Sequence, residues 1–466
     1  SFTIIYPQDV KFNTYYNNGQ MPFSTKKING KNCMVWKKTN VPALALQEPY
    51  APIYGDITNT LQVGTIQSWK EISNWYADLV KKNLKTDKIT KNTFTEIFPN
   101  GFSNLSEEER AKKIYTYIEK NINYSSQDFR QSGYVPQKPS KTITTKLGDC
   151  KDVSTLFVSL AQMANLKANL VLVLTNDNGD AAMALPNKDF NHCIVKVWID
   201  NKEYFLELTD KYLPFKALPM SLYQANALVI SFDKTENEKS TIVKIPFTNA
   251  IKNITTSETV INVDENSKTF TNKITQQGAG KSYYNEFFLP STTEEIRKKR
   301  IEEDFNQILK KVVTYKYAKQ LSNEMFEPSM QFETQFSIQE RLQTVGSLKI
   351  MPVNFIQNVY TRDIISQDTR KYDIRYMNYE NTNEYHNTVF VNVPKEMKII
   401  EIPQNKTLSF KGHSYSISYE LTAPNTLKVT RNALLSWENI KPSDYPLFKK
   451  YVEEVIAAEE QIVGFK

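Results

Sequence analysis

The sequence predicts an α+β protein in three parts. Short β-prone runs fill residues 1–64, helices followed by antiparallel strands fill residues 65–225, and alternating β patterns dominate residues 226–466. Helices that precede antiparallel hairpins are typical of an α+β domain. The chain of 466 residues also has the length of roughly three domains of ~150 residues.

The first part, residues 1–64, alternates short strands with turns. Turn residues occur at Asn17-Asn18-Gly19 and at Asn29-Gly30, and Cys33–Trp36 has the composition of a strand. We therefore expect a small β region without a helix of its own.

Two capping boxes begin helices in the middle part. Ser68 with Glu71 opens a helix that we expect to run to about residue 84, and Ser106 with Glu109 opens a second one. In such a box each side chain binds a backbone N–H that the helix leaves free. These residue pairs therefore predict where both helices begin.

A third helix should begin at Cys150, just after Gly148. Apolar residues recur at helical spacing behind the cysteine, at Val153, Leu156, Phe157 and Leu160. The free amides and the dipole at a helix start stabilise a thiolate over a thiol. Taken alone, a buried cysteine is more often structural than a nucleophile.

The strands that follow bring His192 and a carboxylate together. A buried strand covers residues 170–174, and strands at 190–199 and 203–209 are joined by a tight turn at Asp200-Asn201. With that two-residue turn, residue 194 faces 207 and residue 192 faces 209. Glu207 then shares a face with His192, whereas Asp210 points the other way. Cys150, His192 and Glu207 can thus serve as nucleophile, base and orienting carboxylate.

Residues 226–466 have mostly alternating patterns, interrupted by helices at about 293–311 and 442–460. We expect a β-sandwich with appended helices.

For the remaining candidate residues we expect structural roles. Cys33 and Cys193 are expected in the core, and His386 and His413 at the surface. Trp198 could wall the active-site cleft, but packing within the hairpin is the stronger interpretation. Residues 133–139 and 180–189 could act as lids, and residues 180–187 are expected to border the cleft.

Composition excludes several classes of protein. The net charge of +7 comes from 58 basic and 51 acidic residues that are well mixed, which does not indicate a nucleic-acid surface. Three cysteines and three histidines show no zinc spacing, so no metal or other cofactor is predicted. No apolar stretch approaches the ~18 residues of a transmembrane helix.

The chain resembles the bacterial transglutaminase-like superfamily of papain-type cysteine enzymes. The resemblance lies in Gly-Asp-Cys-Lys-Asp at 148–152, Phe-Asn-His at 190–192 and Phe-Leu-Glu-Leu-Thr-Asp at 205–210. It is strong over roughly 65–215, and it implies a papain-like core between β domains. Residues 1–64 would be the remainder of an N-terminal β-sandwich. The family usually has Leu-Asp-Pro-Thr where this chain has Leu206-Glu207-Leu208-Thr209, so Glu207 takes the orienting place and Asp210 is its understudy.

The resemblance implies a cysteine-dependent acyl-transfer enzyme that acts on peptide or protein substrates. A peptidase or amidase is favoured over an enzyme that joins glutamine to amines. An idle core that serves binding or assembly is the alternative, favoured by the glutamate in place of aspartate. Multidomain members are commonly extracytoplasmic, and the start of the chain, which lacks an initiator methionine, is compatible with a removed signal.

Overall fold

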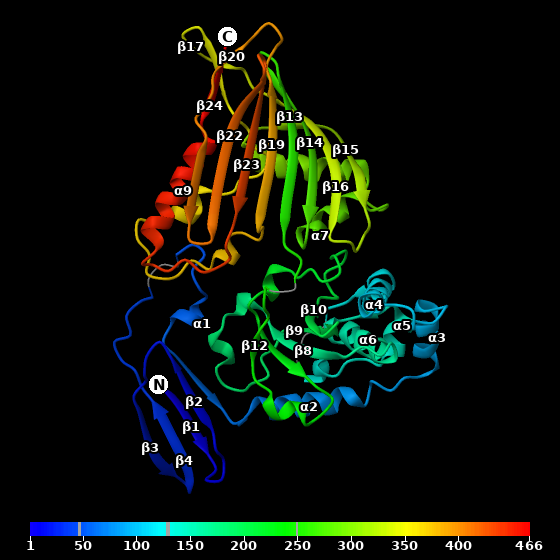
Figure 1. Cartoon of the computed structure of the whole chain (residues 1–466). Helices are drawn as coiled ribbons and strands as arrows, with labels where there is room; N and C mark the ends of the chain where they lie inside the picture. Colours follow the sequence, from blue (N-terminus) through cyan, green and yellow to red (C-terminus); the bar gives the residue numbers. More distant parts are fainter. Residues whose placement is uncertain (45–47, 127–130, 248–249) are drawn as a thin grey trace. The chain divides into compact units, whose positions relative to one another are not determined.

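The computed structural model describes residues 1–44, 48–126, 131–247 and 250–466. The chain forms two compact units, one of residues 1–47, 52–211 and 218–250, the other of residues 48–51, 212–217 and 251–466. Each unit contains its own sheets and helices (Figure 1). This mixture of helices and mostly antiparallel sheets confirms the predicted α+β class.

A five-stranded antiparallel sheet, in the order β10-β9-β8-β11-β12, forms the centre of the first unit. Smaller sheets have the orders β1-β4-β3, β2-β5 and β6-β7. The strands of this unit are β1 Phe2–Tyr6, β2 Asn13–Asn17, β3 Phe23–Ile28, β4 Lys31–Trp36, β5 Thr60–Gly64, β6 Asn123–Tyr124, β7 Leu147–Gly148, β8 Ala168–Leu174, β9 His192–Ile199, β10 Lys202–Leu206, β11 Asn226–Ile230 and β12 Val243–Lys244.

The helices of the first unit begin largely where capping residues predict. They are α1 Tyr54–Ile57, α2 Trp69–Lys81, α3 Lys88–Ile97, α4 Glu107–Asn121, α5 Pro139–Thr145 and α6 Cys150–Met163. At α4 the capping box is complete, and at α2 the Ser68 hydroxyl accepts from the Glu71 N–H. The expectation of no helix within residues 1–64 was wrong, because α1 forms one turn there.

The hairpin of β9 and β10 has the predicted register. Asp200 and Asn201 both have positive φ, 50° and 61°, as a type I′ turn requires. Leu206 pairs with Val195. The ladder ends there, three residues before the predicted end of the strand.

An eight-stranded sheet dominates the second unit, in the order β15-β16-β14-β13-β19-β23-β22-β21. Only β13 and β19 pair in parallel within it. A four-stranded sheet has the order β17-β18-β24-β20. The elements are β13 Ile254–Val263, β14 Ser267–Gln277, α7 Gly280–Asn285, α8 Glu294–Leu309, β15 Val313–Asn323, β16 Ser329–Gln339, β17 Gln343–Val345, β18 Leu348–Pro352, β19 Glu384–Asn392, β20 Ile399–Glu401, β21 Lys406–Phe410, β22 His413–Ala423, β23 Thr426–Leu434, α9 Tyr445–Glu459 and β24 Ile462–Phe465.

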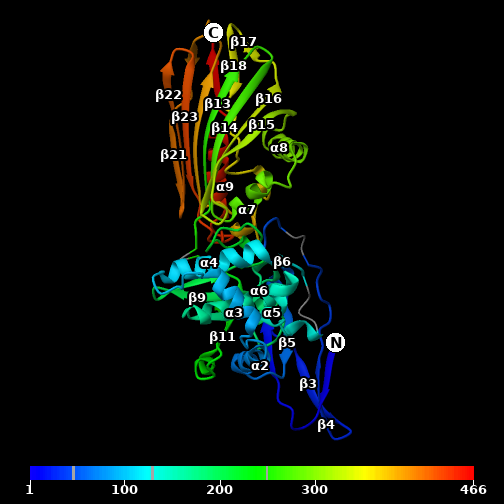
Figure 2. The ribbon, with the colours of Figure 1, turned by 90° about the vertical axis from the view of Figure 1, so that its right-hand side faces the viewer.

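One face of the eight-stranded sheet is buried under helices, and Figure 2 shows α8 to one side of these strands. Phe305 of α8 packs on Phe336 of β16, with ring centroids 4.5 Å apart. The predicted helices at 293–311 and 442–460 are therefore present as α8 and α9.

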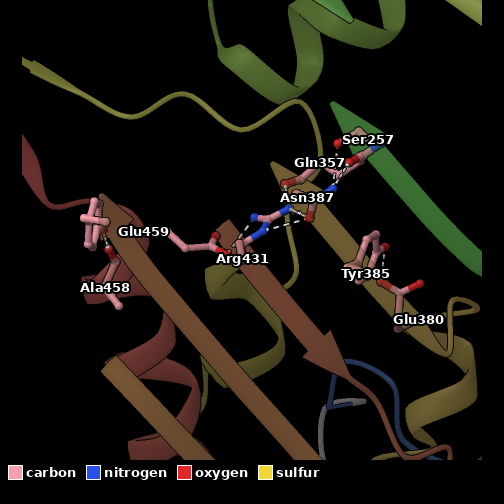
Figure 3. A network of polar contacts seen from close by, with 9 residues as sticks. Ser257, Gln357, Glu380, Tyr385, Asn387, Arg431, Ala458 and Glu459 are labelled. Atoms are coloured by element: carbon pink, nitrogen blue, oxygen red, sulfur yellow. Dashed lines mark hydrogen bonds and ion pairs between the residues drawn. The ribbon is translucent and has the colours of Figure 1, made fainter. Parts of the chain in front are cut away.

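A buried arginine on β23 forms an ion pair with α9 on that face of the sheet (Figure 3). Arg431 of β23 is fully buried and donates to Asn387 Oδ1, to the Gln357 carbonyl and to Glu459 Oε1, the last at 2.7 Å. Its guanidinium also lies 4.1 Å from the ring centroid of Phe355. Breaking such a buried pair is costly, since it leaves an uncompensated charge.

The polar sequence neighbours of His413 suggested a position at the surface. In the structure this residue is buried, with 3% exposed. The Tyr360 hydroxyl lies 3.0 Å from its Nδ1, and the ring of Phe448 lies beside it. Burial lowers the pKa of His413 to about 4, so the ring is neutral. Residues distant in sequence supply these neighbours, so local polarity gave no sign of them.

Candidate active site

The turn before Cys150 requires a glycine. A Cβ at Gly148 would lie 2.9 Å from the Asp152 Cβ and 3.0 Å from the Thr142 Cγ2, closer than side chains pack. Because Gly148 has no side chain, the backbone at this position can pack directly against Asp152 in the first turn of α6. Cys150 is the first residue of α6 and is 3% exposed.

Two aspartates hold the start of this helix. Asp149 accepts from the N–H groups of Lys151 and Asp152, and Asp152 binds back to the Asp149 N–H at 3.0 Å. This complete capping box satisfies backbone donors that a helix leaves free. Gln137 also donates two hydrogen bonds to the Asp152 carboxylate, from its backbone N–H at 2.7 Å and from its side-chain amide at 2.8 Å. The aspartates thus support the turn, as the sequence predicts.

A buried ammonium lies next to the cysteine. Lys151 is 1% exposed, and its Nζ lies 2.7 Å from Asp149 Oδ2. Burial would lower the pKa of Lys151, but the charges of Cys150 and Asp149 outweigh it and raise that pKa above its usual value. The Lys151 ammonium therefore adds a buried positive charge close to Cys150.

His192 and Glu207 form a close pair. His192 Nε2 lies 2.6 Å from Glu207 Oε2, and Glu207 is 2% exposed. Its other oxygen, Oε1, accepts from the Leu208 N–H and from the N–H and hydroxyl of Thr209, at 2.9, 2.6 and 2.6 Å. Strand parity therefore placed Glu207 on the correct side, although the residue follows the last pair of the β10 ladder.

The charges of this pair stabilise each other. Burial opposes charge on His192, but the Glu207 carboxylate and the hydrogen bonds to Cys150 and Glu207 raise the pKa of His192 to about 10. Burial would likewise raise the pKa of Glu207, yet His192 and Thr209 hold it below its usual value. The favoured state is therefore an imidazolium paired with a carboxylate.

Cys150 is the second partner of the His192 ring. A hydrogen bond between the two side chains contributes to the raised pKa of His192. The structure thus joins His192 directly to Glu207. That Cys150 completes a triad with these two residues stays a prediction.

The other predicted residues have structural surroundings. Cys33 and Cys193 are each 1% exposed, as expected of core residues. Burial raises the pKa of Cys193 well above its usual value, so it remains a thiol. The ammonium groups of Lys167 and Lys196 lie 4.6 and 4.8 Å from the ring centroid of Trp198, which fits packing within the hairpin.

The two loops predicted as lids contact each other. The Tyr134 hydroxyl donates to the Lys188 carbonyl at 2.9 Å, and the Lys188 ammonium lies 4.0 Å from the ring centroid of Trp75. That residues 180–187 border the cleft stays a prediction.

Sequence reasoning missed Tyr124 and Lys211. Tyr124 of β6 pairs with Gly148 and is 42% exposed. Burial raises the pKa of Tyr124, and the charges of Cys150, Asp149 and Glu207 contribute to the rise. Lys211 binds carbonyls at the end of α4. The only feature of the sequence that pointed to Lys211 was its position four residues after Glu207.

Within the described ranges, no group of three or more histidine, cysteine, aspartate or glutamate side chains is arranged to hold a metal ion. None of the helices in those ranges combines the length and apolarity needed to cross a membrane.

In a comparison with known families, residues 100–206 match the transglutaminase-like superfamily. The match contains Cys150 and His192 and ends one residue before Glu207. Residues 347–465 match a domain family of unknown function, DUF3858. A comparison with curated proteins found no match.

One solved structure has a similar fold, and a second aligns with about half of the chain. The crystal structure of a "putative protease" from Parabacteroides distasonis aligns with 99% of this chain and 71% of its own, with a TM-score of 0.56 and 14% identity. A "putative cysteine protease" from Cytophaga hutchinsonii aligns with 52% of this chain and 76% of its own, with a TM-score of 0.23 and 12% identity. At these identities the first likeness bears on fold alone.

Proposed function

We propose that this chain is a cysteine-dependent acyl-transfer enzyme that hydrolyses peptide or isopeptide bonds. The match of residues 100–206 to the transglutaminase-like superfamily supports the proposal. The pair of His192 and Glu207, 2.6 Å apart, carries the proposal together with Cys150 at the start of α6. A nucleophile, an imidazole and an orienting group recur on unrelated folds.

In the proposed reaction, the Cys150 thiolate attacks the carbonyl carbon of an amide. His192, protonated and held by Glu207, gives its proton to the leaving amine as the C–N bond breaks and a thioester forms. A water molecule, deprotonated by His192, then hydrolyses the thioester. A primary amine in place of water would give transglutamination, which is the less favoured outcome.

The start of α6 supplies one group for the transition state. The Cys150 N–H is among the first amides of a helix, which have no partner within it. We assign this N–H as one donor to the oxyanion of the tetrahedral intermediate. Removing one such donor from an enzyme typically costs about 10²- to 10³-fold in turnover.

The second candidate function is a binding or assembly protein with an idle core. The observation that favours it is the burial of Cys150, which is only 3% exposed. In that case the thiol fills space in the core, and the hydrogen bonds around it serve stability.

The test compares Cys150→Ala with Cys193→Ala. We expect Cys150→Ala to abolish cleavage of a fluorogenic peptide library and of casein while its melting temperature stays nearly unchanged. Cys193→Ala removes another buried thiol from the same unit and should keep activity, with a stability loss on the order of 1 kcal/mol.

The opposite pattern supports the idle core. There, no cleavage or incorporation of a fluorescent amine is found with the unchanged protein, and Cys150→Ala lowers the melting temperature as Cys193→Ala does.

A further inference from the structure

The end of helix α4 is bonded to the turn that leads to the cysteine. Beyond the helix, the Asn123 N–H donates to the Lys146 carbonyl at 2.8 Å, and the Ser125 N–H donates to the Gly148 carbonyl at 2.9 Å. These bonds extend the parallel pairing of β6 with β7. The position of Gly148, two residues before Cys150, is therefore fixed relative to α4.

The same end of α4 holds the chain just after Glu207. The Lys211 ammonium donates to the carbonyls of Glu119 and Ile122, the second at 2.6 Å. Both carbonyls belong to the end of the helix, where a cation is favoured by the helix dipole. Lys211 is half-buried, so water competes only partly for these bonds.

Glu207 lies between two attachments. The β10 ladder ends at Leu206, one residue before it, and Lys211 anchors the chain four residues after it. Within the turn, Thr209 binds the carboxylate through its N–H and its hydroxyl. These bonds lie within the turn itself. The bonds of Lys211 instead attach the turn to the end of α4, which also binds the turn before Cys150.

We propose that Lys211 is a positioning residue, which fixes the turn that holds Glu207 at hydrogen-bond distance from His192. The proposal rests on the proposed function, because it assigns Lys211 a part in activating the thiol. Lys211 itself touches no reacting atom.

A purely structural role would be to cap α4. Lysine side chains near helix ends commonly bind the last carbonyls and stabilise the helix. Capping predicts a loss of stability when Lys211 is replaced, but no change in the ionisation of the Cys150 and His192 pair. The two roles therefore differ in the pH dependence of the thiol.

Several titratable groups face this pair and would contribute to any such change. They are Lys151 on α6 with Asp149 at its N-cap, Tyr76 on α2, Cys193 on β9, Tyr124 on β6, and Tyr115 on α4, which itself interacts with Glu119, Glu207 and Asp210. Burial lowers the pKa of Lys211 and the charge of Glu119 opposes this, so replacing Lys211 alters the surroundings of Glu119. Lys211→Arg keeps the positive charge beside Glu119 and so controls for this contribution.

The experiment measures the rate of Cys150 alkylation by iodoacetamide against pH, followed by mass spectrometry of the labelled peptide. The variants are Lys211→Met, which keeps the length of the side chain but not its charge, and Lys211→Arg, which can still donate to two carbonyls. Lys120→Met removes an exposed lysine from the last turn of α4 and serves as the matched control. Lys211→Gln, which keeps one donor group, is measured in parallel in case Lys211→Met does not fold.

We expect Lys211→Met to move the rise in alkylation rate about one unit toward higher pH, Lys211→Gln to move it less, and Lys211→Arg to restore it. Lys120→Met should leave it unchanged. If the Lys211 variants melt at lower temperature but alkylate with the pH dependence of the unchanged protein, Lys211 only caps the helix and the inference is wrong. If the unchanged protein never labels Cys150 faster than Cys33 and Cys193, the proposed function itself fails.

Discussion

Replacing Glu207 with glutamine changes the charge beside His192 but little of the surrounding geometry. The glutamine oxygen can take the place of Oε1 and keep the bonds from Leu208 and Thr209. Its amide nitrogen then faces His192 Nε2, which the Glu207 carboxylate now approaches to 2.6 Å. Two donors would meet there unless the imidazole loses its proton at Nε2.

The size of the effect follows from the ionisation of His192. Its pKa is raised from 6.5 to about 10, and at about 1.4 kcal/mol per unit this favours the imidazolium by roughly 5 kcal/mol. Glu207 is the largest of the favourable contributions, ahead of Cys150. An opposite charge at this range is worth about one to three pKa units. A less stable imidazolium stabilises the thiolate less, so Glu207→Gln should move the rise in Cys150 alkylation by about one to three units toward higher pH.

The assay is the rate of iodoacetamide labelling of Cys150 from about pH 4 to 9, with the peptidase rate measured beside it. Loss of the orienting carboxylate lowers turnover in related triads by about 10⁴-fold, because the imidazole takes the wrong tautomer. A variant that folds, and whose labelling has the same pH dependence as the unchanged protein, would refute the role given to Glu207.

Two further predictions concern stability. Asp149→Ala leaves the Lys151 ammonium buried without its carboxylate and should lower the unfolding free energy by about 3–5 kcal/mol. Asp87→Ala removes an exposed N-cap of α3 and should cost only about 1 kcal/mol; equal losses in denaturant titrations would contradict this account of Lys151. The raised pKa of His192 means that its stabilising contribution is complete below about pH 6.5 and is lost as pH rises to about 10. Relative to His192→Gln, the unchanged protein should therefore lose up to about 5 kcal/mol across that window, and parallel stability curves would show that the ion pair adds nothing.

Local chemistry made much of the site predictable from sequence. The capping box of Ser106 and Glu109 acts over three residues, so the start of α4 could be identified without knowledge of the fold. The two-residue turn at Asp200-Asn201 fixes the register of β9 and β10. That register, with strand alternation, was sufficient to place Glu207 rather than Asp210 beside His192.

Contacts between distant residues could not be predicted in this way. Lys211 binds carbonyls 92 and 89 residues earlier in the chain, and no local pattern indicates such a partner. His413 is buried by rings from other elements, and its polar sequence neighbours suggested the surface instead. The parallel pairing of β13 with β19 likewise joins strands that are far apart in sequence.

The most direct test of the central claim is the relative labelling of the three cysteines by iodoacetamide near neutral pH, read by peptide mass spectrometry. Cys33, Cys150 and Cys193 are all buried, at 1%, 3% and 1% exposure, so access alone does not distinguish them. A thiolate paired with an imidazolium should make Cys150 react at least ~100-fold faster than the other two. Equal, slow labelling at all three positions would contradict the assignment of Cys150 as a nucleophile.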